Sequence, residues 1–264
     1  MCSRFPRRAA AALVALLATA ASAAELRVCA DPDNMPYSDT RGLGFENRIA
    51  ALVAAEMGMA LRYEWMPLRR GFVRKTLGAN LCDVLIGVPA GFDRVLTTRP
   101  YYRSAYVFVH RRDQPARGFD DPRLRSMRLG VQLIGNDLAA TPPGLALAEH
   151  GAVENVTGFT IYGEGPAAER MVEAIEHGGL DGCLAWGPQV AYFARRADPP
   201  LEVTLLTAPA GMEAIPFTFP ISMGVRKADG ALRDRLDRAL ERRHADIEAI
   251  LDSYAVPRLA GGTP

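Results

Sequence analysis

Cysteine and histidine are the residue types here whose chemistry depends most on spacing, and the chain has 4 of each. Cys29, Cys82 and Cys183 match no zinc-binding pattern, and no histidine stands at ligand spacing from any of them. The sequence also shows no Ser/His/Asp order and no motif of paired carboxylates. We therefore predict no metal, no cofactor and no catalytic group.

The first two dozen residues have the pattern of a secretory leader. Arg4, Arg7 and Arg8 precede an apolar stretch over 9–21, and residues 21–23 have the small-x-small form of a cleavage site. A buried helix, the alternative interpretation, is disfavoured because the apolar stretch has no polar face. We therefore predict a signal peptide over residues 1–23 and a mature protein in the periplasm.

Export places the cysteines in an oxidising compartment, where one disulfide and one buried thiol is the simplest arrangement for the three that remain. Cys29 and Cys82 lie on segments predicted to be neighbouring strands, so they are the expected disulfide pair. Cys183 lies in an apolar run, where a thiol behaves as a small hydrophobic group.

Composition bounds the class of protein. The 264 residues are 49% hydrophobic and 23% charged with a net charge of +1, which excludes a disordered chain and a general nucleic-acid binder. No apolar run after residue 24 approaches the roughly 20 residues of a transmembrane segment. Residues 60–110 contain eight basic and three acidic side chains. This local excess of +5 would suit an acidic partner or an anionic ligand, or it belongs to a solvated surface balanced elsewhere.

The apolar pattern predicts two alternations of strands and helices. Strands are expected at 26–30, 61–65 and 84–88, with helices from 45 to about 57 and over 70–77. After a β-prone segment at 101–109, strands at 127–132, 156–161 and 180–185 alternate with helices at 141–149 and 166–177. The chain ends with a strand at 221–225 and a helical pattern over 232–254 that has a candidate break at 242–244. This order predicts an α/β fold.

The last segment is too small to form its own core, so we expect it to return to the first α/β unit. The predicted architecture is a clamshell of two α/β lobes joined by two crossing strands, with the ligand site between them. Lobe 1 would comprise residues 24–109 plus 219–264, and lobe 2 residues 110–218.

Nine short stretches, in order along the chain, resemble the type II periplasmic binding proteins. They resemble most specifically the branch associated with quinoprotein dehydrogenases, the J-type proteins of methanol oxidation clusters. The stretches cover residues 27–34, 44–47, 69–74, 82–84, 91–92, 96–104, 130–135, 186–188 and 222–226. The resemblance implies the same clamshell and a non-catalytic accessory role beside a dehydrogenase that depends on pyrroloquinoline quinone (PQQ).

The resemblance also implies where ligand groups would stand. Amino-acid-binding members hold the ligand carboxylate with an arginine at the position of Arg94, which could instead bond to loop carbonyls or to Asp93. They use a helix N-terminus in the second lobe for the same carboxylate, where this chain has Asn136 and Asp137. Asp137 would either oppose an anion there or cap the helix.

These members also use an aspartate for the ligand ammonium, and Trp186 stands at its position. An indole cannot neutralise an ammonium as a carboxylate does, so the resemblance argues against a free α-amino acid as ligand.

Further candidates come from turns that would face the opposite lobe. Asp33, Asn34 and Tyr37 follow the first strand, and Trp65, Arg69 and Arg70 follow the second. Tyr37 and Trp65 would line the cleft or be core aromatics at strand ends.

Three functions are compatible with these features. The favoured one is an accessory protein that aids the maturation or activation of a PQQ-dependent alcohol or methanol dehydrogenase. The alternative is the substrate-binding component of an ABC importer for a small solute other than an amino acid. An enzyme is disfavoured, because no motif supports one.

Overall fold

The computed structural model describes residues 24–114, 118–134, 139–160 and 165–259. The predicted signal peptide, Asn136 and Asp137 lie outside the described residues. The helices are α1 (Phe45–Glu56), α2 (Phe72–Lys75), α3 (Pro142–Glu149), α4 (Ala167–Glu176), α5 (Gly187–Ala194), α6 (Gly230–Arg242) and α7 (His244–Ser253), with a 3-10 turn, η1 (Pro122–Arg125).

The longer strands are β1 (Glu25–Ala30), β4 (Ala60–Trp65), β5 (Val84–Pro89), β7 (Tyr102–His110), β8 (Leu129–Ile134), β10 (Val156–Thr160), β11 (Gly182–Trp186), β12 (Glu202–Leu205) and β13 (Thr218–Val225). Four two-residue strands complete the list: β6 (Leu96–Thr97), β9 (Ala139–Ala140), and β2 (Asp33–Asn34) with β3 (Ser38–Asp39), which pair as a hairpin.

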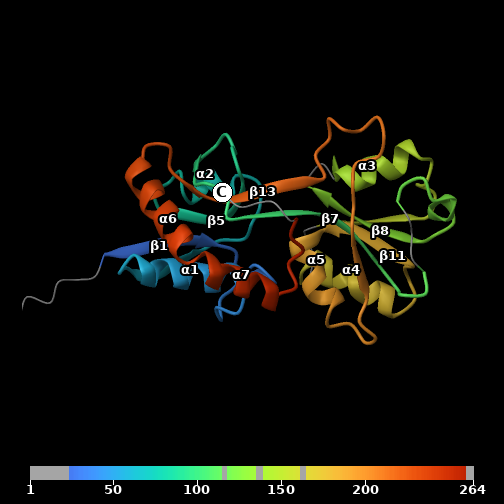
Figure 1. The fold of residues 1–264 in the computed structure, drawn as a ribbon, viewed down its shortest axis with the longest axis horizontal. Helices are drawn as coiled ribbons and strands as arrows, with labels where there is room; N and C mark the ends of the chain where they lie inside the picture. The colour runs from blue at the N-terminus through green and yellow to red at the C-terminus, as the bar shows by residue number, and fades with distance from the viewer. Residues whose placement is uncertain (1–23, 115–117, 135–138, 161–164, 260–264) are drawn as a thin grey trace, which may run out of the picture.

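One mixed sheet runs through the molecule in the order β10-β8-β11-β7-β13-β5-β1-β4. The parallel strands β1, β4 and β5 lie on one side, and the parallel strands β8, β10 and β11 lie on the other. Between these groups β7 and β13 pair with each other. On its other side β13 pairs with β5 of the first group, and β7 pairs with β11 of the second. Figure 1 shows these two strands running between the lobes, which confirms the predicted clamshell with two crossing strands.

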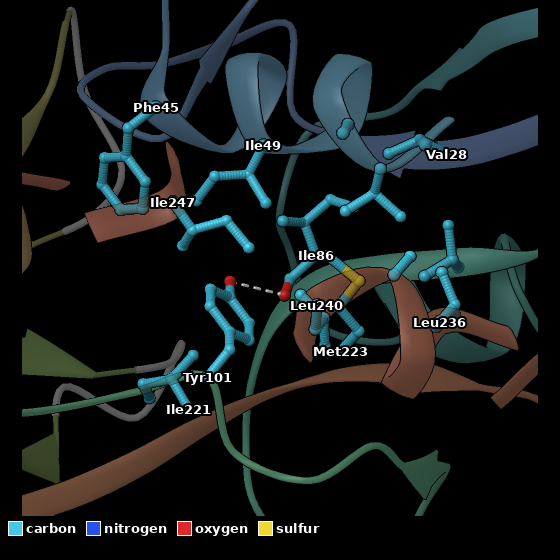
Figure 2. Close-up of a cluster of buried hydrophobic side chains, with 14 of the residues drawn as sticks. Val28, Phe45, Ile49, Ile86, Tyr101, Ile221, Met223, Leu236, Leu240 and Ile247 are labelled. Carbon is cyan, nitrogen blue, oxygen red and sulfur yellow. Dashed lines mark hydrogen bonds between the residues drawn. The ribbon is translucent and has the colours of Figure 1, made fainter. Parts of the chain in front are cut away.

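In the first lobe, alternation along the strands separates two cores. Leu26 and Val28 of β1, with Val84 and Ile86 of β5, face a core that α1, α6 and α7 cover. Figure 2 shows side chains of all three helices converging on Val28, Ile86 and Met223. The apolar side chains of α1 therefore face the core on one side of the helix, as the sequence pattern predicts.

The opposite face of the same strands carries the disulfide. Cys29 and Leu85 point there, toward a smaller core with Phe72, Leu77 and Cys82. The Cα atoms of Cys29 and Cys82 lie 5.4 Å apart and the two residues are bonded, which confirms the predicted pair. The helix predicted over 70–77 is shorter, because Gly71 has a φ of +84° and α2 begins only after it.

The second lobe repeats this division. Leu129, Val131 and Leu184 face one core, which α3 covers. Val107, Val109 and Cys183 face another core with α4 and α5, and there burial raises the pKa of the Cys183 thiol to about 12. Cys183 is thus the buried free thiol that the sequence predicts.

The end of the chain returns to the first lobe. α6 ends at Arg242 and α7 begins at His244, which confirms the predicted break, and both helices contribute to the core beneath α1. The proposed boundaries between residues 109 and 110 and between 218 and 219 stay predictions. Within the described ranges, no helix is long and apolar enough to cross a membrane.

Candidate functional site

An aromatic cluster lies where the crossing strands meet the second lobe. Tyr106 of β7 contacts Trp186 at the end of β11, with ring centroids 5.4 Å apart, and Phe219 of β13 lies 5.7 Å from Trp186. Trp186 packs against cores of both lobes. The cluster therefore sits at the junction that any hinge motion would have to rearrange.

Tyr37 joins this cluster from the first lobe. It lies in the turn between β2 and β3, and its ring contacts Phe45 with centroids 5.0 Å apart. The side chain of Trp186 is near enough to lower the pKa of Tyr37, against the larger and opposite effect of burial. Two residues that the sequence placed separately in the cleft thus lie near each other across the lobes.

Glu46 is a second feature of the junction, and the sequence analysis missed it. It occupies the first turn of α1, where a Cβ added to Gly87 would lie 2.1 Å from its Oε1 atom. Glu46 is half-buried and has no hydrogen-bond or ion-pair partner among the described residues. Loss of water around it raises the pKa of its carboxyl to about 8.

Tyrosines surround this carboxyl. Burial is the main reason why the pKa values of Tyr37, Tyr101 and Tyr102 lie well above the ordinary value, and the charge of Glu46 adds to each. A carboxyl with aromatic neighbours and no internal counter-ion is suited to accept a cationic group or, when protonated, to donate a hydrogen bond. The signal in the sequence was Gly87, since a glycine inside an apolar strand often marks a close approach.

A groove also opens between the lobes. A cavity of about 430 Å³ is lined by Asp33 and Arg41 from the first lobe and, from the second, by Arg196 and three glutamates of α4, Glu169, Glu173 and Glu176. Burial, then the charges of Glu173 and Asp33, raise the pKa of Glu169. Asp33 thus faces the opposite lobe as predicted, although its use for a ligand stays a prediction.

The other predicted site residues are more dispersed. Asn34 pairs with Ser38 in the small hairpin, and Trp65 stacks on Tyr63 with ring centroids 4.5 Å apart. Arg69 and Arg70 lie in the exposed loop after β4, and Arg94 lies in the exposed loop after β5. In the described chain, no hydrogen bond, ion pair or ring contact joins Trp65, Arg70 or Arg94 to Trp186, so their assignment to the cleft stays a prediction.

This fold and these residues can now be set beside known proteins. The family model of bacterial extracellular solute-binding proteins, family 3, matches residues 26–256. The chain belongs to this family. Within it the chain is one of the J-type proteins: Protein MoxJ of Paracoccus denitrificans is 35% identical over 268 residues, which is 95% of each chain.

Two further relatives agree. Protein MoxJ of Methylorubrum extorquens is 36% identical over 90% of this chain and 82% of its own. The crystal structure of the periplasmic binding protein XoxJ from Methylobacterium extorquens AM1 has a TM-score of 0.74 and 37% identity, covering 89% of this chain and 99% of its own. These J-type relatives confirm the predicted family membership, and the extracellular family agrees with the predicted export.

Proposed function

We propose that this protein is a periplasmic accessory protein that binds a PQQ-dependent alcohol or methanol dehydrogenase and aids its maturation or activation. The observation that carries the proposal is the full-length relationship to the MoxJ proteins, at 35–36% identity. The dehydrogenase would hold the quinone and perform the oxidation. This chain would supply recognition and no catalytic group.

The lobe junction supports a role other than the capture of amino acids. Trp186 stands where amino-acid-binding members place a carboxylate, and its ring packs against Tyr106 and Phe219. An ammonium group would find no acceptor on this side chain. The chain thus keeps the fold of the solute-binding family but lacks the carboxylate that binds an ammonium group at this position.

The disulfide supports the proposed compartment. A bond between Cys29 and Cys82, buried in the small core of the first lobe, is typical of proteins in an oxidising environment such as the bacterial periplasm. Together with the secretory pattern over 1–23, it supports export through a cleaved signal peptide.

Deletion and complementation of the gene test the proposal. Without the gene, growth on the alcohol and dehydrogenase activity in periplasmic extract should fall, and the full-length gene should restore both. The tagged protein should also retain the dehydrogenase from this extract. Unchanged alcohol oxidation in the deletion strain would refute the accessory role.

The groove favours one alternative, the substrate-binding component of an ABC importer. A cavity of about 430 Å³ is large enough for a small solute, and its four carboxyl groups outnumber its two arginines, Arg41 and Arg196, which would favour a cationic or polyhydroxylated solute over an acid. Mass spectrometry of small molecules in the same eluate separates the two functions. A stoichiometric solute without dehydrogenase would support the importer.

A further inference from the structure

Exposed basic side chains without partners gather on one part of the first lobe. Arg74 and Lys75 lie on α2, Arg70 lies just before it, and Arg94 lies in the loop after β5. These four residues, which we call the basic surface, are all exposed and form no ion pair or side-chain hydrogen bond with the described residues. Asp93, next to Arg94 in the sequence, offsets one of these four positive charges, so the basic surface keeps a net positive charge.

Packing holds these residues near one another. Phe72 and Val73 of α2 contact the same small core as Phe92 and Val95, which flank Arg94. That core also contains the Cys29–Cys82 disulfide, so its backbone is cross-linked. The basic surface therefore stands on a rigid base, which lowers the entropy lost when a partner binds.

Several arginines elsewhere are neutralised inside the protein. Arg27 and Arg226 both pair with Asp83. In the second lobe Arg123 pairs with Asp121 and Arg128 pairs with Asp181. Other exposed arginines, including two on α6, are also without an ion pair among the described residues, so the basic surface is distinguished by the grouping of its four charges around one small core.

Exposed apolar groups accompany these charges. Leu68 precedes the basic surface with 48% of its surface exposed, and Leu81 follows α2 with 43% exposed. Arginine with adjacent apolar area is typical of protein–protein interfaces, and guanidinium groups bind carboxylates with two parallel hydrogen bonds. A second copy of this chain is a poor occupant, because its acidic groove lies elsewhere and such a head-to-tail contact would not close into a dimer.

We propose that Arg70, Arg74, Lys75 and Arg94 form the docking surface for an acidic patch on a protein partner. The inference rests on the proposed function, which makes the dehydrogenase that partner. Charges at an interface act mainly on the association rate, and salt screens them over a Debye length of about 8 Å at physiological ionic strength.

The test compares two triple variants with equal charge. R70Q/R74Q/R94Q removes charge from the basic surface, and R195Q/R235Q/R238Q removes three exposed arginines from the end of α5 and from α6. Binding of the purified PQQ-dependent dehydrogenase is measured by surface plasmon resonance at 20 mM and 500 mM NaCl. Melting temperature and co-sedimentation with anionic phospholipid vesicles are measured on the same samples.

The association rate of the first variant should fall about tenfold at low salt, with most of that difference lost at high salt. The control variant should stay within about twofold of the wild type, and both should keep the wild-type melting temperature. Equal binding of both variants overturns the docking surface while leaving the proposed function standing. Binding to vesicles that only the first variant loses would assign the surface to membrane lipid instead. A wild-type protein that does not bind the dehydrogenase refutes the proposed function itself.

Discussion

Removal of the Cys29–Cys82 disulfide is expected to lower the free energy of unfolding by about 4 kcal/mol. The bond closes a loop with a sequence separation of 53 residues. In the chain-entropy model, a loop of this length removes about 14 cal/mol/K from the unfolded ensemble, which is about 4 kcal/mol at 25 °C. The bond lies beside a rigid contact, because Arg226 donates to the carbonyl of Cys82 and to the carboxylate of Asp83.

The double variant C29A/C82A makes this change, and C183A provides a matched control. Cys183 is as deeply buried as Cys82 but has no bond, so its replacement measures only the lost packing of a sulfur atom. Urea unfolding followed by circular dichroism gives each free energy. We expect the free energy of unfolding that C29A/C82A loses to exceed twice the loss in C183A by several kcal/mol.

Two results would refute this reasoning. The first is a loss of stability in C29A/C82A that is no larger than twice the loss in C183A. The second is the titration of three free thiols in the denatured, unreduced mature protein, since the bonded protein should show one.

Three further outcomes are expected at the lobe junction. The common α-amino acids at millimolar concentration should leave the melting temperature unchanged, because Trp186 offers no acceptor for an ammonium; a saturable rise with any of them would contradict this. E46Q should reduce the pH dependence of the free energy of unfolding. In the folded protein the pKa of the Glu46 carboxyl is raised from 4.5 to about 8, so this group ionises first in the unfolded chain. The stability of the wild type therefore falls as the pH rises through that range. Urea unfolding at pH 5 and pH 8 checks this, and parallel pH profiles for E46Q and wild type would exclude it. Y101F should cost about 1 kcal/mol by removing the buried hydrogen bond that the Tyr101 hydroxyl donates to the carbonyl of Ile86. Y192F, which alters a stacked ring with no described hydroxyl bond, should cost little; equal losses in the two variants would mean that the hydrogen bond contributes nothing.

Local periodicity was sufficient to predict most of the fold. Phe45, Ile49 and Val53 repeat at four-residue intervals and face one core, and this spacing is set by helix geometry alone. The break near Arg243 was also visible, because three consecutive basic or polar residues, 242–244, interrupt the apolar pattern there. Elements that depend on tertiary contacts were not predicted. α5 begins at Gly187-Pro188, a pair that reads as a break, although proline is well tolerated in the first turn of a helix.

The site was predictable residue by residue but not as an arrangement. The family resemblance singled out Trp186, and the turn after the first strand suggested Tyr37, yet nothing in the sequence indicates that they lie near each other. Glu46 was missed for a physical reason: an acidic residue in the first turn of a helix is favoured by the helix dipole and usually needs no other explanation. Only the approach of Gly87 shows that this carboxyl points inward.

The two proposals have a common physical basis in how the chain pairs its polar groups. At the lobe junction, Trp186 packs against Tyr106 and Phe219 and offers no acceptor to an ammonium group. The carboxyls of Glu46 and Glu169, which have no hydrogen-bond or ion-pair partner among the described residues, would still suit a cationic solute there. On α2 and the loop after β5, Arg70, Arg74 and Arg94 have no partner in the described part of the chain and would suit an acidic protein surface. The basic surface is therefore the part of this charge distribution that supports recognition of a protein, and the acidic groove is the part that supports the importer.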